Sequence, residues 1–257
     1  MSRPIFLNGL DLQSGSFRIA DSDIFNAPPK VVTVIELARK EGAKAVFERF
    51  GSRKINLTGY IQDTTSNIAD ASLDELKAFV GRRSLELKVE FNGAFRIWTV
   101  NAENLQVARK NTDVSRMGFN LQLVAPNPFG ADESTTTLVD ESGITDDINI
   151  PLTGGGTFFA QPLITITINS INPDDSDVTL SVGNASENTY MDITNTFVAG
   201  DVITIDSFNE IIYKNSTIIE GDGLFPIWSP TGGTLEFTHS ASTIDVDILA
   251  TYYRRWL

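Results

Sequence analysis

Few residues in this chain have side chains suited to acid–base or nucleophilic chemistry. Its 257 residues include one histidine, His239, and no cysteine, which excludes thiolate catalysis, disulfide bonds and cysteine-based metal centres. A Ser-His-Asp triad would need His239, but this residue ends an alternating apolar and polar run, where a strand-end imidazole is the ordinary case. One histidine cannot build a histidine-rich zinc site. We therefore expect no catalytic residue, no metal and no cofactor.

Oxygen ligands of the kind that calcium prefers are concentrated between Asn172 and Asp177. This segment lacks the regular spacing and the distal glutamate of an EF-hand, and a solvated turn between strands accounts for the same residues. A glycoside hydrolase needs two carboxylates across a cleft, but residues 132–257 contain 19 acidic residues, so some pair would meet that condition by chance. A hydrolase is therefore the least favoured function.

Carbohydrate binding demands less, because an exposed aromatic face with polar neighbours is sufficient. Tyr213, Trp228 and Tyr252 are the candidate sugar contacts, and Tyr253 is also available. Tyrosine and tryptophan are equally common in cores and at protein interfaces. A carbohydrate-binding module is therefore carried as the alternative function.

The net charge of −13 is unevenly distributed along the chain. Residues 1–131 contain 17 Lys and Arg against 14 Asp and Glu, a net charge of +3, whereas residues 132–257 contain 3 against 19, a net charge of −16. Binding to a phosphate backbone depends on Lys and Arg, so we expect no specific nucleic-acid binding. The abrupt change in composition also predicts two domains.

No run of 18 apolar residues is present, and the N-terminus enters a strand-like Ile5-Phe6-Leu7 without a signal-peptide core. We therefore expect a soluble protein made in a cytoplasm, with no membrane partner. The basic residues of the first half form pairs without interleaved aromatic residues, which suits salt-bridged subunit contacts better than nucleic-acid recognition. These pairs are Arg39-Lys40, Arg53-Lys54, Arg82-Arg83 and Arg109-Lys110.

The first half is predicted to be β-rich with one helix, over Leu73–Val80. Ser72 and Glu75 have the spacing of a capping box, in which each side chain satisfies a backbone amide of the other. Leu73, Leu76, Phe79 and Val80 form one apolar stripe, so the helix should pack on the sheet. The exposed Lys77, Arg82 and Arg83 are then candidate subunit-interface residues. The expected strands are 5–12, 16–19, 31–37, 45–50, 55–61, 85–100 as a hairpin, 105–108 and 117–124.

The hairpin within residues 85–100 allows two registers. A two-residue turn at Asn92-Gly93 would pair Leu87 with Trp98 and place Phe95 and Ile97 on the face of Lys88 and Glu90. A three-residue loop with Gly93 in a bulge would instead pair Leu87 with Ile97. The second register keeps all the apolar residues on one face, and we favour it for that reason.

Residues 131–156 are poor in aromatic residues and rich in Gly, Thr, Ser and Asp, which predicts a linker, with a short strand at 135–140. From residue 157 onward every segment is short, β-branched and bounded by turn residues. In Thr243–Ile248 the apolar Ile244, Val246 and Ile248 alternate with aspartates, as a half-buried antiparallel strand requires. The sequence thus predicts domains at 1–130 and 157–257, the second a β-sandwich or jelly roll.

Several segments in order resemble the distal tail protein (Dit) family of long-tailed, siphovirus-type bacteriophages. In the first half they are Phe6–Gly9, Arg53–Gly59 leading to the helix, the 87–98 hairpin, and Met117–Leu123 running into Pro126-Asn127-Pro128. In the second half Ala160–Ile166, Gly200–Asp206 and Phe225–Gly233 resemble the galectin-like β-sandwich of many members.

This resemblance implies a structural protein of the virion, and not an enzyme, made in the bacterial host. The first domain would be a tail-tube-like split β-barrel or sandwich that forms a homohexameric ring joining the tail tube to the baseplate or tail tip. The implied partners are further copies of the chain, the tail tube protein, the tail-tip or baseplate hub protein, and the tape measure protein. Unpaired sheet edges in the first half suit closure into a ring, although an ordinary barrel that closes on its own strands would satisfy the same pattern.

Overall fold

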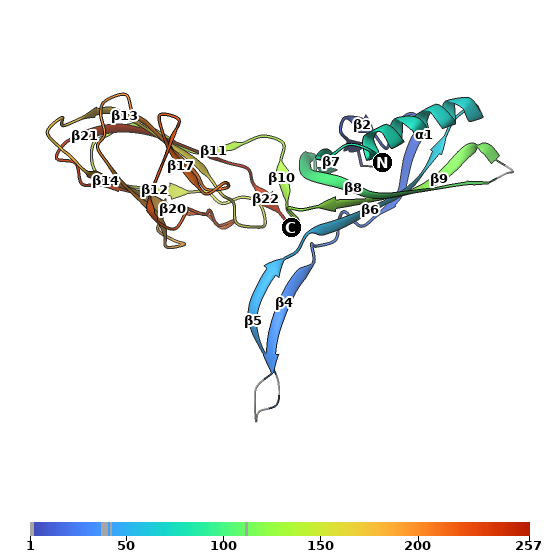
Figure 1. Ribbon diagram of the computed structural model, residues 1–257, viewed down its shortest axis with the longest axis horizontal. Helices are drawn as coiled ribbons and strands as arrows, with labels where there is room; N and C mark the ends of the chain where they lie inside the picture. The colour runs from blue at the N-terminus through green and yellow to red at the C-terminus, as the bar shows by residue number, and fades with distance from the viewer. Residues whose placement is uncertain (1–2, 37–40, 42, 111–112) are drawn as a thin grey trace. The chain divides into compact units, whose positions relative to one another are not determined.

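The computed structural model describes residues 3–36, 41, 43–110 and 113–257 of the chain. They form two compact units, one of residues 1–131 together with Leu257 and the other of residues 132–256, and each is described by itself (Figure 1). The predicted mainly β fold with a single described helix is confirmed. Among the described residues, no helix combines the length and the apolar composition needed to cross a bilayer.

The first unit is built on one antiparallel sheet with strand order β2-β1-β7-β8-β9-β6-β3. The long strand β8 pairs with β7 along its first half and with β9 along its second half, so it joins the two parts of the sheet. The strands are β1 (Ile5–Leu7), β2 (Leu10–Asp11), β3 (Phe17–Ser22), β6 (Arg53–Gln62), β7 (Leu85–Phe91), β8 (Ala94–Lys110) and β9 (Asp113–Ala125), with β10 (Gly130–Asp132) at the boundary of the unit.

The β7–β8 hairpin has the register that we did not favour. Leu87 pairs with Trp98, and Asn92 and Gly93 form a two-residue turn with φ of 51° and 82°. The expectation was wrong because it assumed that one face of the hairpin must hold every apolar residue. Trp98 is buried in the core, while Phe95 on the opposite face packs edge-on against Phe6 at 5.9 Å. Both faces of this hairpin therefore have apolar contacts.

Helix α1 (Ser66–Val80) begins seven residues earlier than predicted. Thr65 is its N-cap, and the Thr65 hydroxyl accepts from the amide of Ile68 at 3.4 Å, so Ser72 lies inside the helix and the Ser72–Glu75 capping box is wrong. The predicted stripe is confirmed for Leu73 and Leu76, which are buried. Ala69, one turn earlier, extends the same buried face.

A separate hairpin follows β3. Strands β4 (Lys30–Glu36) and β5 (Ala43–Phe50) pair antiparallel with each other and with no other strand in the described part of the chain (Figure 1). Residues 37–40 and 42 lie outside the described residues, and with them the expected end of the first strand and the Arg39-Lys40 pair. This two-stranded hairpin is called the arm below.

The second unit is a sandwich of two antiparallel sheets. One sheet has the order β11-β21-β13-β16-β17-β18 and the other β12-β20-β14-β15-β19. Alternate residues of both sheets, such as Ile166, Val182, Phe237 and Val246, form a single core between them. The strands of the two sheets are β11 (Thr136–Ile144), β12 (Ile148–Leu152), β13 (Leu163–Ile171), β14 (Val178–Asn184), β15 (Thr189–Asn195), β16 (Val202–Asp206), β17 (Ile211–Lys214), β18 (Thr217–Ile219), β19 (Asp222–Gly223), β20 (Gly233–His239) and β21 (Ile244–Tyr252). The short strand β22 (Arg255–Trp256) lies outside both sheets.

The predicted linker at 131–156 is wrong for most of its length. β11 pairs with β21 and β12 pairs with β20, so both strands belong to the sandwich. Val139, Ile144 and Leu152 are buried in its core. The turn-forming composition of this stretch reflects β-bulges in β11, and the chain divides into its two units between Ala131 and Asp132.

Candidate functional site: an assembly surface

The arm exposes an unusual amount of apolar surface. Val31, Val32, Val34 and Ile35 are between 43% and 58% exposed, and every residue of β4 is exposed. Successive residues of a strand point to opposite faces, so apolar side chains lie on both faces of the arm. Full burial of one such side chain is worth about 1.5–3 kcal/mol, and covering four half-exposed ones would contribute several kcal/mol to an association.

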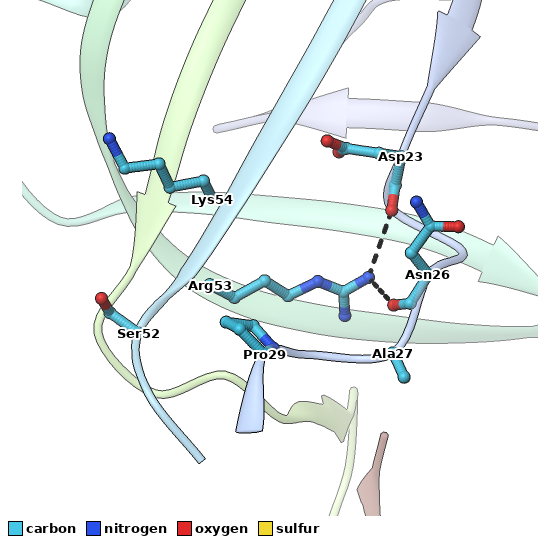
Figure 2. A pocket seen from close by; sticks show the side chains of 7 residues that line it. All are labelled: Asp23, Asn26, Ala27, Pro29, Ser52, Arg53 and Lys54. Carbon is cyan, nitrogen blue, oxygen red and sulfur yellow. Dashed lines mark hydrogen bonds between the residues drawn. The ribbon is translucent and has the colours of Figure 1, made fainter. Parts of the chain in front are cut away.

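The base of the arm is fixed by a buried arginine, Arg53, the first residue of β6. Its Nη2 donates to the carbonyl oxygens of Asp23 at 3.5 Å and Asn26 at 2.5 Å, and also to that of Ile24 (Figure 2). Arg53, which follows the arm in the chain, therefore holds the segment that precedes the arm. Burial lowers the pKa of Arg53, and the Asp23 carboxylate opposes this shift.

A second polar contact of Asp23 completes this base. Its two carboxylate oxygens accept from the backbone amide of Asn56 at 2.7 Å and from the Asn56 side-chain amide at 2.6 Å. The amide of Gly51 also donates to the carbonyl oxygen of Pro29 at 3.0 Å, which joins the two ends of the arm directly. The arm is thus anchored at a defined position on the first unit.

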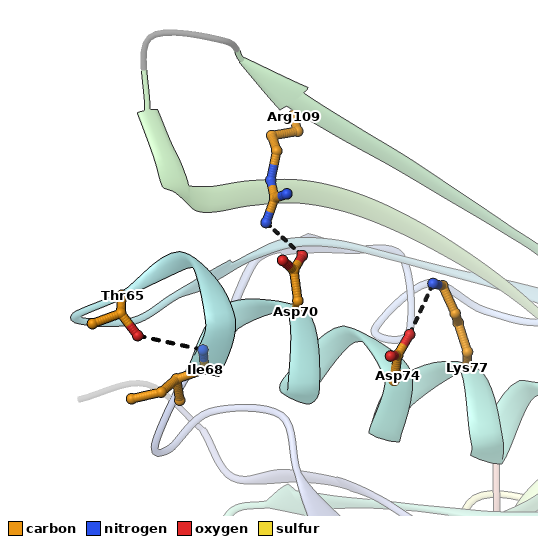
Figure 3. A network of polar contacts seen from close by, with 6 residues as sticks. All are labelled: Thr65, Ile68, Asp70, Asp74, Lys77 and Arg109. Carbon is orange, nitrogen blue, oxygen red and sulfur yellow. Dashed lines mark hydrogen bonds and ion pairs between the residues drawn. The ribbon is translucent and has the colours of Figure 1, made fainter.

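The predicted interface residues of the helix are exposed but partly engaged within the chain. Lys77 forms an ion pair with Asp74 at 3.0 Å on the outer face of α1 (Figure 3). The Arg82 guanidinium lies 5.0 Å from the centre of the Phe79 ring, and Arg83 is exposed. Asp70, nearer the start of the helix, pairs with Arg109 of β8 at 2.6 Å. Exposed pairs of this kind contribute little to stability.

Two of the three predicted sugar contacts are contradicted by their burial. Trp228 is 3% exposed and Tyr252 is 4% exposed, and both belong to the sandwich core. Burial raises the pKa of Tyr252. A buried ring cannot stack on a sugar, so these two assignments are wrong. Tyr213 is half-buried on β17, and the additional candidate Tyr253 is 50% exposed.

The other candidate chemical residues have local structural roles. His239 is the last residue of β20, as the pattern predicted, and its backbone amide donates to Asp147 at 3.1 Å. In the acidic turn, Asp175 accepts from the amide of Ser242 at 2.7 Å. Among the described residues, no three His, Cys, Asp or Glu side chains are grouped closely enough to hold a metal ion.

The sequence patterns did not identify two features of this surface. The apolar run of β4 indicates a strand, but a run of this kind is typical of a buried strand, and here it is exposed. Arg53 was grouped with Lys54 as a surface pair, whereas alternation along β6 buries Arg53 and exposes Lys54. The strict alternation from Arg53 to Ile61 was the available signal, because it places Arg53 on the face of Ile55 and Leu57.

Taken together, the two units define a mainly β protein with an N-terminal sheet that holds one helix and an exposed arm, followed by a β-sandwich. No family model matches the sequence. No curated protein sequence matches it either.

Solved structures identify the fold more closely. The chain resembles the Dit protein of phage SPP1 along the full length of both chains, with a TM-score of 0.70 and 12% identity. That structure is described as a paradigm of the hub adsorption apparatus in phages that infect Gram-positive bacteria. The chain also resembles a component of the phage P2 baseplate in its activated conformation, over 99% of this chain and 98% of the other, with a TM-score of 0.50 and 8% identity. The chain therefore has a Dit-like fold.

Proposed function

We propose that this chain is a structural component of a phage tail, a Dit-type hub at the junction of the tail tube and the baseplate or tail tip. The full-length fold similarity to SPP1 Dit is the observation that carries the proposal. In this role the protein acts by assembly and has no enzymatic activity. Its place is the virion, after synthesis in the cytoplasm of a bacterial host.

We further propose that the chain assembles as a homohexameric ring through its first unit. The exposed apolar side chains of the arm support self-association, because apolar surface gathered on one element often marks a protein–protein contact. A head-to-tail contact that closes on itself would cover the arm on every copy. The neighbours of the ring would be the tail tube protein, the tail-tip or baseplate hub protein and the tape measure protein. Lys77, Arg82 and Arg83 remain candidate rim residues of its subunit interface.

The proposed ring can be tested by the size of the full chain in solution. Ile35→Asp places a charge on the arm, and Leu224→Asp is its matched control because Leu224 is similarly exposed on the second unit. We expect hexamers by light scattering and six-fold rings by electron microscopy for the parent and for Leu224→Asp, and smaller species for Ile35→Asp. A monomeric parent would contradict the ring, and an intact ring in Ile35→Asp would exclude the arm from its contacts.

The carbohydrate-binding alternative retains Tyr213 alone among its three predicted contacts. This alternative would require that the parent protein binds a sugar and that Tyr213→Ala abolishes this binding.

A further inference from the structure

A pocket of about 490 Å³ lies at the base of the arm (Figure 2). It is formed by the segment that enters the arm and the segment that leaves it. Its lining residues are Asp23, Asn26, Ala27, Pro29, Ser52, Arg53 and Lys54. All of them belong to the first unit, so the pocket is complete within one compact part of one chain.

Arg53 has unused hydrogen-bond donors in this pocket. Every hydrogen bond of its guanidinium is made by Nη2, and Nη1 and Nε donate to none of the described residues. In Figure 2, Nη1 is directed away from the two carbonyl groups and towards Ala27 and Pro29. Neither nitrogen is fully enclosed, although the residue as a whole is 3% exposed. A nearly buried cation with three unpaired N–H groups has a strong tendency to pair with an acceptor.

The other charged groups of the pocket are already engaged. The Asp23 carboxylate accepts two hydrogen bonds from Asn56, and the Lys54 ammonium pairs with Glu103 at 2.9 Å. Lys54 lies on the exposed face of β6, so Arg53 is the buried cationic group among the lining residues. A single guanidinium beside the apolar surface of Ala27 and Pro29 suits a singly charged anion with an apolar stem, whereas a phosphate dianion would need further donors.

We propose that this pocket binds a carboxylate group, held by Nη1 of Arg53. The carboxylate belongs either to a free aliphatic acid or to an Asp or Glu side chain of a second copy of the chain. The second source rests on the proposed ring, and the net charge of −16 on residues 132–257 supplies acidic side chains for it. In that case the pocket joins the base of one arm to a neighbouring subunit.

Butyrate is a suitable probe, because it carries the carboxylate and the methylene groups of a glutamate side chain, and butyramide is its uncharged control. Saturation-transfer NMR on the full chain should show butyrate binding at least about tenfold tighter than butyramide, as expected for hydrogen bonds to a charged group. Arg109→Gln, at an arginine outside the pocket, should keep this preference and Arg53→Gln should lose it. Equal binding of the two probes to the parent chain would overturn the proposal.

Arg53→Gln could fail to fold, so a second measurement uses the parent chain alone. A crystal grown with 4-bromobutyrate should show the anomalous signal of bromine in the pocket, with the carboxylate against Nη1 of Arg53. An empty pocket beside bromine peaks elsewhere would overturn the proposal. Bromine in the pocket without the butyrate preference in solution would show an adventitious additive only, and would also overturn it.

Sedimentation of the parent chain with and without saturating butyrate distinguishes the two sources. Weaker assembly in butyrate assigns the carboxylate to a second copy, and unchanged assembly with butyrate bound assigns it to a free acid. A hexamer that shows no preference for butyrate would overturn this inference and leave the proposed function intact. A monomer that prefers butyrate would support this inference and contradict the proposed ring.

Discussion

At the residue scale, Asp201 shows how a buried charge is accommodated in the acidic second unit. It is 4% exposed, and it accepts from the amide of Val198 at 2.8 Å, from Lys214 at 3.0 Å and from Asn215 at 2.5 Å. Burial pushes the pKa of Asp201 up, but these hydrogen bonds and the charge of Lys214 outweigh burial and lower it. Asp201 therefore stabilises the start of β16 as a carboxylate.

Asp201→Asn should destabilise the protein at neutral pH by about 1–3 kcal/mol, because the remaining donors lose a charged acceptor. The folded pKa lies below the unfolded value of about 3.9, so this stabilisation is complete above that value and is lost as the pH falls through the folded pKa. Urea unfolding at several pH values should show the gap between parent and variant closing in acid. Asp140→Asn, on an exposed position of β11, is the control. A gap that does not depend on pH would contradict the role of the charge.

At the element scale, the helix and the β7–β8 hairpin show which local sequence signals are sufficient to predict the bounds and the register of an element. The existence of α1 and its buried face follow from apolar spacing, but its start does not, because Thr65 and Ser72 are both good capping residues and burial of Ala69 decides between them. The register of the hairpin follows from its turn, and the count of apolar residues on one face was misleading. Turn geometry is local, whereas the burial of a face depends on what covers it.

Leu76→Ala should lower the free energy of unfolding by about 2–5 kcal/mol, because Leu76 is fully buried between α1 and the sheet. Lys77→Glu, one position along on the exposed face, should leave the stability nearly unchanged. Thermal melts of the two variants check this difference. Equal melting temperatures for Leu76→Ala and the parent would show that the helix is not packed on the core.

Gly93→Ala should cost about 1–2 kcal/mol, because Gly93 has φ of 82° and a β-carbon is disfavoured in that region. There is open space around the position, so backbone strain and not a clash would be the cause. Gly51→Ala is a useful comparison, since Gly51 does not have a positive φ and an added β-carbon would meet its nearest neighbour, Val31, at an ordinary contact distance of 3.5 Å. Denaturant unfolding of the two variants should separate them, and equal stability would argue against the two-residue turn.

At the scale of the whole molecule, the division into two units was predictable and the division point was nearly so. The change from net positive to strongly acidic composition indicates a second domain, but the Gly- and Asp-rich stretch between the units belongs to the sandwich as β11 and β12. The exposure of the arm could not be predicted from the sequence. The same apolar pattern is expected whether a strand is covered by its own chain or by another chain. The buried Arg53 site was missed for a similar reason, since its acceptors are backbone carbonyls.

Separate fragments should show that self-association belongs to the first unit. We expect residues 1–131 to form oligomers and residues 132–257 to remain monomeric, since the acidic fragment is self-repelling and lacks the arm. Light scattering at matched concentrations measures both, and circular dichroism confirms that each is folded. A monomeric first fragment beside an oligomeric second fragment would reverse the assignment.

The continuity of β8 has a mechanical consequence. Its 17 residues run without a break from the hairpin with β7 into the pairing with β9. A pulling force along this strand would load its interstrand hydrogen bonds in shear, because they lie across the strand, so many bonds would have to yield together. The first unit would then transmit tension from β7 to β9 through one continuous strand, whose pairing changes partner between Val100 and Asn101.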